Sequence, residues 1–142
     1  MRLRCGATSP IAERAGGVHL GETSLPPSDA KRLIQSAQAK GVLTKDFLLG
    51  VSCHSLEAAK AAAANGADYI FFGPIFPTPA KEKFGPPQDL ERLREVCQSV
   101  SIPVLAIGGI TVDTAGSCIE AGAAGIAAIR LFQNSPGPLP CL

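Results

Sequence analysis

Five short apolar runs recur along this 142-residue chain, and each is closed by glycine or by a polar turn. They span residues 16–21, 47–54, 67–74, 102–109 and 124–132. Their apolar residues are continuous rather than alternating with polar ones, which is typical of strands that are covered on both faces. The runs therefore predict the strands of a buried parallel sheet.

Helical patterns fill the intervals between these runs, at residues 28–41, 55–66, 88–100 and 111–122. Ser28 and Ser55 are N-cap candidates, and Gly41, Gly66 and Gly122 stand at the ends of three of the helices. The repeated strand–helix order predicts parallel strands joined by right-handed crossovers. A closed (β/α)8 barrel typically takes about 250 residues. The pattern therefore fits either an open doubly wound sheet or the later part of a barrel.

Composition and charge exclude several classes of partner. The formal net charge is +1 with scattered basic residues, which gives no electrostatic footprint for nucleic acid or an anionic membrane. No apolar run approaches the roughly 18 residues of a membrane span, and no secretory signal is evident. The five cysteines form no C-x-x-C pair, which argues against a disulfide framework and a structural zinc site. Reduced thiols favour a cytoplasmic protein.

Ligands of parallel α/β folds bind at the carboxyl ends of the strands. The polar and glycine residues of interest at the ends of the predicted strands are Ser52, His54, Thr78, Lys81, Gly108, Gly109 and Arg130. Paired glycines before a helix expose backbone N–H groups, which is the chemistry of a phosphate site. Lys81 offers a cation with three donors and Thr78 a hydroxyl, on a loop stiffened by prolines. We therefore expect a phosphate site at these strand ends.

The same residues also have purely structural interpretations. Ser55 is better explained as a helix N-cap than as a ligand. His54 is compatible with a hydrogen-bonded structural histidine, and Gly108 and Gly109 with a simple turn. The loop that carries Lys81 is compatible with a stiff surface loop whose lysines are solvated.

Five motifs together match a known family. In order they are GVHLGETSLP, GVSCHS, ADYIFFGPIFPTPAK, IPVLAIGGI and AGIAAIRLF. From about Gly16 to Phe132 the chain resembles the thiamine phosphate synthase family, which includes the TenI-like thiazole tautomerases. The resemblance implies a (β/α)8 TIM barrel, here represented by about its last five βα units. It also implies a transferase of thiamine biosynthesis that joins an aminopyrimidine pyrophosphate to a thiazole phosphate with the help of Mg²⁺.

The resemblance also assigns roles to residues. It implies that Ser52, Thr78 and Lys81 hold pyrophosphate or phosphate. It implies that Gly109 and the backbone around Ile129 and Arg130 hold the thiazole phosphate. The small phosphorylated thiazole and pyrimidine are then the expected partners.

The chain departs from the family pattern at several positions. The family's early glutamine–arginine–lysine strand and Asn-Asp pair have no counterpart here. Ser24 stands where the synthases carry an aspartate metal ligand, so no metal-ligating residue is assigned. Ala80 replaces a threonine of the lysine loop, and Arg130 replaces a serine near the phosphate, where arginine can also bind.

Three functions remain open. The leading one is the condensation of the aminopyrimidine pyrophosphate with the thiazole phosphate to give thiamine phosphate. The second is a TenI-like tautomerase in which His54 acts as acid and base, a role that suits histidine near neutral pH. The third is a catalytically inactive barrel fragment that binds phosphate or needs a partner. A sugar-phosphate epimerase would need carboxylates at opposing strand ends, and the sequence shows none there.

The chain divides into three regions. Residues 1–15 form an atypical N-terminal segment, 16–132 the barrel region, and 133–142 a Pro/Gly-rich tail that we expect to be disordered. With the early strands absent, the strands of Val18 and Ile126 would be apolar edges. Such edges invite pairing with another chain, so a homo-oligomer is an open alternative.

Overall fold

The computed structural model describes residues 3–4, 15–21, 23–78 and 86–129. The strands are β1 (Leu3–Arg4), β2 (Gly17–Leu20), β3 (Leu48–Cys53), β4 (Tyr69–Phe72), β5 (Val104–Ile107) and β6 (Gly125–Ala127). The helices are α1 (Pro27–Ala39), α2 (Leu56–Ala64), α3 (Asp89–Ser99) and α4 (Val112–Glu120). Each of the five predicted strands and four predicted helices is present, usually a few residues shorter than its pattern. The predicted tail at 133–142 lies outside the described residues.

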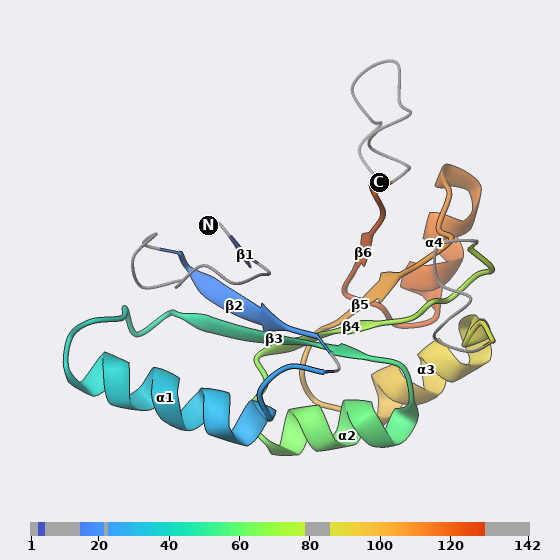
Figure 1. Ribbon diagram of the computed structural model, residues 1–142. Coiled ribbons are helices and arrows are strands. Elements are labelled where there is room, and N and C mark those ends of the chain that lie inside the picture. The colour runs from blue at the N-terminus through green and yellow to red at the C-terminus, as the bar shows by residue number, and fades with distance from the viewer. Residues whose placement is uncertain (1–2, 5–14, 22, 79–85, 130–142) are drawn as a thin grey trace, which may run out of the picture.

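The six strands form one parallel sheet whose spatial order is the order of the sequence, β1-β2-β3-β4-β5-β6. A doubly wound sheet would reverse its strand order at a switch point and carry helices on both faces. Figure 1 instead shows a sheet curved into a trough, with the helices along its outer side. This is the arrangement of consecutive βα units in a barrel wall, and the predicted partial (β/α)8 barrel is confirmed.

One edge of the sheet differs from the prediction. Val18 was expected on an edge strand, but β1 pairs with β2 through Leu3 opposite Gly17 and Arg4 opposite Val18. The prediction was wrong because a strand of two residues leaves no apolar run in the sequence. Ile126 lies on β6, which is the edge of the sheet within the described residues.

The core lies between the outer face of the sheet and the helices. Its most deeply buried side chains are Leu49, Ile70, Phe72, Ala106, Ala59, Leu93, Val96 and Cys118. Side chains alternate along a strand, so the residues next to the buried strand residues face the concave side of the sheet. The residues on this concave side include His19, Ser52, Tyr69 and Phe71.

Helix ends follow the predicted signals with one exception. Ser55 caps α2, since its hydroxyl accepts a hydrogen bond from the Ala58 N–H at 3.1 Å. Gly41, Gly66 and Gly122 all have positive φ after their helices, as a left-handed cap requires. The N-cap prediction for Ser28 was wrong. That helix begins at Pro27, whose fixed φ suits the first helical position.

Asp68 joins the amino-terminal ends of the strands to a helix. Its carboxylate accepts hydrogen bonds from Lys31 Nζ at 3.1 and 3.2 Å and from the Leu49 N–H at 2.7 Å. These contacts tie α1, β3 and β4 together at the end of the sheet opposite the predicted site. Holding the strands in this register aligns their carboxyl ends at the opposite end of the sheet.

Within the described residues, no helix is long and apolar enough to cross a membrane.

Candidate functional site

Two loops meet at the carboxyl end of β4 and β5. The Ile75 N–H donates to the Ile107 carbonyl at 3.0 Å, and the Phe76 N–H donates to the Gly108 carbonyl at 3.1 Å. Gly108 and Gly109 have φ angles of 98° and 67°, which residues other than glycine rarely adopt. A Cβ on Gly109 would lie 2.7 Å from the Phe76 carbonyl oxygen. The glycine pair is therefore needed for this close approach of two backbones.

The predicted site residues gather at one end of the sheet. Ser52 and His54 stand at the end of β3, Gly108 and Gly109 follow β5, and Thr78 follows β4 on the segment that packs against them. Ile129 follows β6, with its side chain 70% exposed. Lys81 and Arg130 lie outside the described residues. The phosphate-binding roles of all these residues remain predictions.

His54 is held in one tautomer by a backbone contact. Its Nδ1 makes a hydrogen bond with the Gly73 carbonyl oxygen. A carbonyl oxygen can only accept, so Nδ1 carries a proton, and in the neutral ring Nε2 carries the lone pair. A ring nitrogen with a lone pair is what a general base requires.

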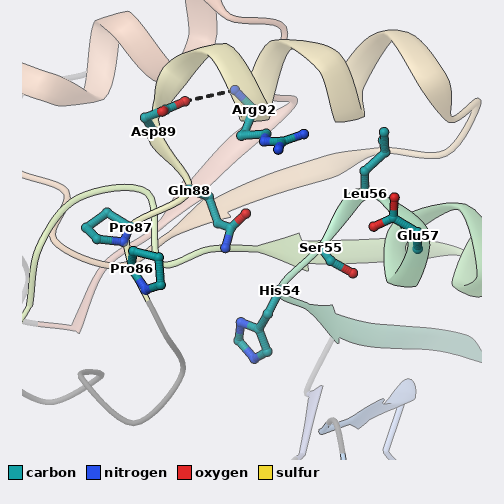
Figure 2. A pocket seen from close by; sticks show the side chains of 9 residues that line it. All are labelled: His54, Ser55, Leu56, Glu57, Pro86, Pro87, Gln88, Asp89 and Arg92. Atoms are coloured by element: carbon teal, nitrogen blue, oxygen red, sulfur yellow. Dashed lines mark hydrogen bonds between the residues drawn. The ribbon is translucent and has the colours of Figure 1, made fainter.

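A pocket of about 380 Å³ opens beside His54, between the start of α2 and the start of α3. It is lined by His54, Ser55, Leu56, Glu57, Pro86, Pro87, Gln88, Asp89 and Arg92. Figure 2 shows these side chains around the space, with the Asp89 carboxylate accepting from the Arg92 N–H. The Arg92 guanidinium also donates to Glu95 at 3.0 Å. With two carboxylates and one guanidinium, the lining carries no excess of positive charge and does not extend the predicted phosphate site.

A polar cluster on the concave face was not foreseen from the sequence. His19 Nε2 lies 2.9 Å from Ser52 Oγ, and His19 Nδ1 lies 3.2 Å from the Tyr69 hydroxyl. The Phe71 ring lies 4.5 Å from the imidazole, measured between centroids. Gly50 stands opposite both His19 and Tyr69, and a Cβ there would lie within 2.5 Å of each. The sequence shows only a single histidine inside an apolar run, and the register that places it opposite Gly50 has no local signal.

Lowering the pH is expected to destabilise the chain through His19. Burial lowers the pKa of His19 from its ordinary value of 6.5, so the unfolded state binds more protons between the two pKa values. This part of the stability is fully present above pH 6.5 and is lost as the pH falls through the folded-state pKa. Urea unfolding between about pH 5 and pH 8 measures it. His19→Gln should lose less stability over that range, and an equal loss in both proteins would contradict the assignment.

The position of the expected magnesium ligand carries a hydroxyl, that of Ser24. The described residues include no group of three or more His, Cys, Asp or Glu side chains that could hold a metal ion. The Ser24 hydroxyl, at the position of the expected carboxylate, accepts a hydrogen bond from the Gly21 N–H at 3.0 Å. Its oxygen therefore serves the turn after β2, and a neutral hydroxyl is a poor substitute for a carboxylate ligand.

Comparisons with known proteins agree with one another. A family model described as thiamine monophosphate synthase matches residues 9–132. A thiamine-phosphate synthase from Roseiflexus castenholzii is 41% identical over 128 residues, covering 90% of this chain and 52% of that protein. One from Methanocella arvoryzae is 44% identical over 119 residues, covering 84% of this chain and 52% of that protein. The solved structure of thiamine phosphate pyrophosphorylase from Pyrococcus furiosus is 38% identical with a TM-score of 0.67, covering 84% of this chain and 52% of that chain. The chain thus spans about half the length of the relatives it matches.

Proposed function

This chain belongs to the thiamine monophosphate synthase family, and we propose that residues 16–132 carry the phosphate-binding end of a thiamine phosphate synthase. In this proposal Ser52, Thr78 and Lys81 hold pyrophosphate or phosphate. Gly108 and Gly109, with the backbone at Ile129 and Arg130, hold the phosphate of a thiazole. The proposed reaction joins that thiazole phosphate to an aminopyrimidine pyrophosphate in the cytoplasm, where the cysteines remain thiols.

The observation that carries the proposal is the contact between the two loops. Two backbone hydrogen bonds, from Ile75 and from Phe76, fasten the glycine turn to the segment that leads to Thr78. A hydroxyl and a glycine turn on neighbouring strand ends are a suitable pair for phosphate oxygens. Backbones locked together in this way need little reorganisation when an anion binds.

Removing a single site hydroxyl should weaken the binding of pyrophosphate. A hydrogen bond to a charged group contributes about 1.5–3 kcal/mol, so Ser52→Ala or Thr78→Ala should each raise the dissociation constant about tenfold or more. Calorimetric titration of the full chain with pyrophosphate, and separately with thiazole phosphate, measures the change. Ser36→Ala is the matched control, since Ser36 is exposed on α1.

Two results would contradict the proposal. In one, the unchanged chain binds neither anion, although its unfolding is cooperative. In the other, it binds both with affinities that neither hydroxyl affects. If the chain binds both anions but catalyses nothing, the remaining interpretation is an inactive barrel fragment that needs a partner.

A second candidate function is favoured by one observation. The Gly73 carbonyl fixes the proton of His54 on Nδ1, which leaves the lone pair on Nε2. A thiazole tautomerase needs such a base to move a proton on the thiazole carboxylate, and His54 is the residue proposed for it. This function would use the same thiazole phosphate but no pyrimidine.

A further inference from the structure

The imidazole of His19 connects two hydroxyl groups of different chemistry. Tyr69 is a phenol on β4 and Ser52 is an alcohol on β3, and each lies within hydrogen-bond distance of one ring nitrogen. A neutral imidazole has one N–H donor and one lone pair, so the two nitrogens play opposite parts. The direction of the hydrogen bonds through the ring therefore depends on which hydroxyl donates to it.

The acidity of the hydroxyls decides that direction. A phenol, with a pKa near 10, gives up its proton far more readily than an alcohol and is the stronger hydrogen-bond donor. The Tyr69 hydroxyl is then the donor to Nδ1, and the N–H at Nε2 donates to Ser52 Oγ. Burial lowers the pKa of His19, which keeps the ring neutral and preserves this polarity.

We propose that His19 is a positioning residue, which accepts from Tyr69 and donates to Ser52 so that the hydrogen of the Ser52 hydroxyl is turned towards an anionic ligand. A serine hydroxyl otherwise rotates to any acceptor in reach. With one side of the oxygen occupied by the His19 N–H, its own hydrogen is directed elsewhere. The identity of the ligand, a phosphate or pyrophosphate, rests on the proposed function, whereas the tautomer of His19 does not.

The neighbouring side chains support a fixed ring. Phe71 packs on the imidazole at 4.5 Å between centroids, and Tyr69 lies at 5.7 Å. Gly50 leaves the space in which the Tyr69 hydroxyl and His19 Nδ1 meet, since a Cβ would lie 2.3 and 2.5 Å from them. A ring confined in this way can hold a hydroxyl in one orientation before a ligand arrives, which lowers the cost of binding.

Nitrogen NMR of the full chain, labelled at histidine, tests the tautomer directly. The chain has only two histidines, and His54→Asn assigns the signals. At a pH near 8, His19 should carry its proton on Nε2, whereas His54 should carry its proton on Nδ1. A His19 ring protonated on Nδ1 would overturn the proposal.

A double-mutant cycle tests the effect on the ligand. When His19→Phe is the only substitution, it should weaken pyrophosphate binding about tenfold. When it is added to Ser52→Ala, it should have little further effect. His19→Gln, which can still donate to Ser52, should restore part of the loss. An equal loss in both backgrounds would mean that His19 acts independently of Ser52 and would overturn the proposal.

Two further outcomes separate this inference from the proposed function. If the unchanged chain binds no pyrophosphate, the proposed function fails and the ligand role of Ser52 fails with it, whatever the tautomer. If the chain binds pyrophosphate but the cycle shows no coupling, only the role of His19 fails. Should His19→Phe not fold, Tyr69→Phe removes one oxygen and should produce a mixture of His19 tautomers with a smaller loss of affinity. An unchanged tautomer in Tyr69→Phe would also overturn the proposal.

Discussion

Gly73→Ala is expected to lower the free energy of unfolding by about 3 kcal/mol, the upper part of the range for overpacking a close-packed site. A Cβ on Gly73 would lie 1.9 Å from the carbonyl oxygen of Ile107 and 2.9 Å from its carbon. These are backbone atoms of β5, so no side-chain rotation relieves the clash. The same carbonyl accepts the hydrogen bond from Ile75 that fastens the two loops together. Urea unfolding measures the loss.

Gly116→Ala is the matched control for this substitution. Gly116 lies inside α4, and a Cβ there would meet nothing within 4 Å. Because alanine loses less backbone entropy than glycine in a helix, this variant should gain about 0.5–1 kcal/mol. Equal effects of the two substitutions, or a Gly73→Ala protein as stable as the unchanged chain, would show that β4 and β5 do not approach each other as described.

The loss of stability should be accompanied by a loss of anion binding. If Gly73→Ala still folds at low temperature, the two loops must separate to admit the new methyl group. Pyrophosphate affinity should then fall even though Ser52 and Thr78 are both retained. Unchanged affinity in a destabilised Gly73→Ala protein would mean that the contact between the loops supports the fold but not the ligand.

Much of the architecture could be predicted because it depends on local patterns. Strands buried on both faces leave continuous apolar runs, and helix ends leave Ser and Gly at fixed positions. The distinction between a doubly wound sheet and a barrel could not be made from those patterns, because it depends on the spatial order of the strands. The motif resemblance favoured the barrel, and the strand order and the family match confirmed it.

The concave cluster shows what sequence patterns leave out. His19, Gly50 and Tyr69 are far apart in the chain, and only the register of three strands brings them together. A one-residue change of register would turn each side chain to the other face of the sheet. No local signal specifies that register, so the contact between Ser52 and His19 could not be predicted from the sequence.

The helix N-termini show a similar limit on a smaller scale. Ser28 and Ser55 are both serines before a helical pattern, yet only Ser55 is a cap. Pro27 occupies the first position of α1, and its fixed φ starts the helix one residue before Ser28. Pro27 and Ser28 are both helix-start signals, and the helix begins at the proline because its φ is already fixed near the helical value.

His54→Asn is expected to separate the structural and chemical roles of His54. The asparagine Nδ2 replaces the ring Nδ1 as a donor to the Gly73 carbonyl, whereas nothing replaces the lone pair at Nε2. Stability and pyrophosphate affinity should therefore stay close to those of the unchanged chain. On the tautomerase proposal, the rate of proton transfer should fall about 10²–10⁴-fold, the usual contribution of a general base.

Proton NMR of the thiazole phosphate in deuterated buffer measures that rate in the unchanged chain and in His54→Asn. Ser52→Ala is the complementary variant, since it should weaken pyrophosphate binding while leaving the base in place. A proton-transfer rate that falls in His54→Asn but not in Ser52→Ala would support the tautomerase. A chain that binds thiazole phosphate but exchanges no proton, with or without His54, would exclude the tautomerase and leave His54 as a residue that orients the end of β4.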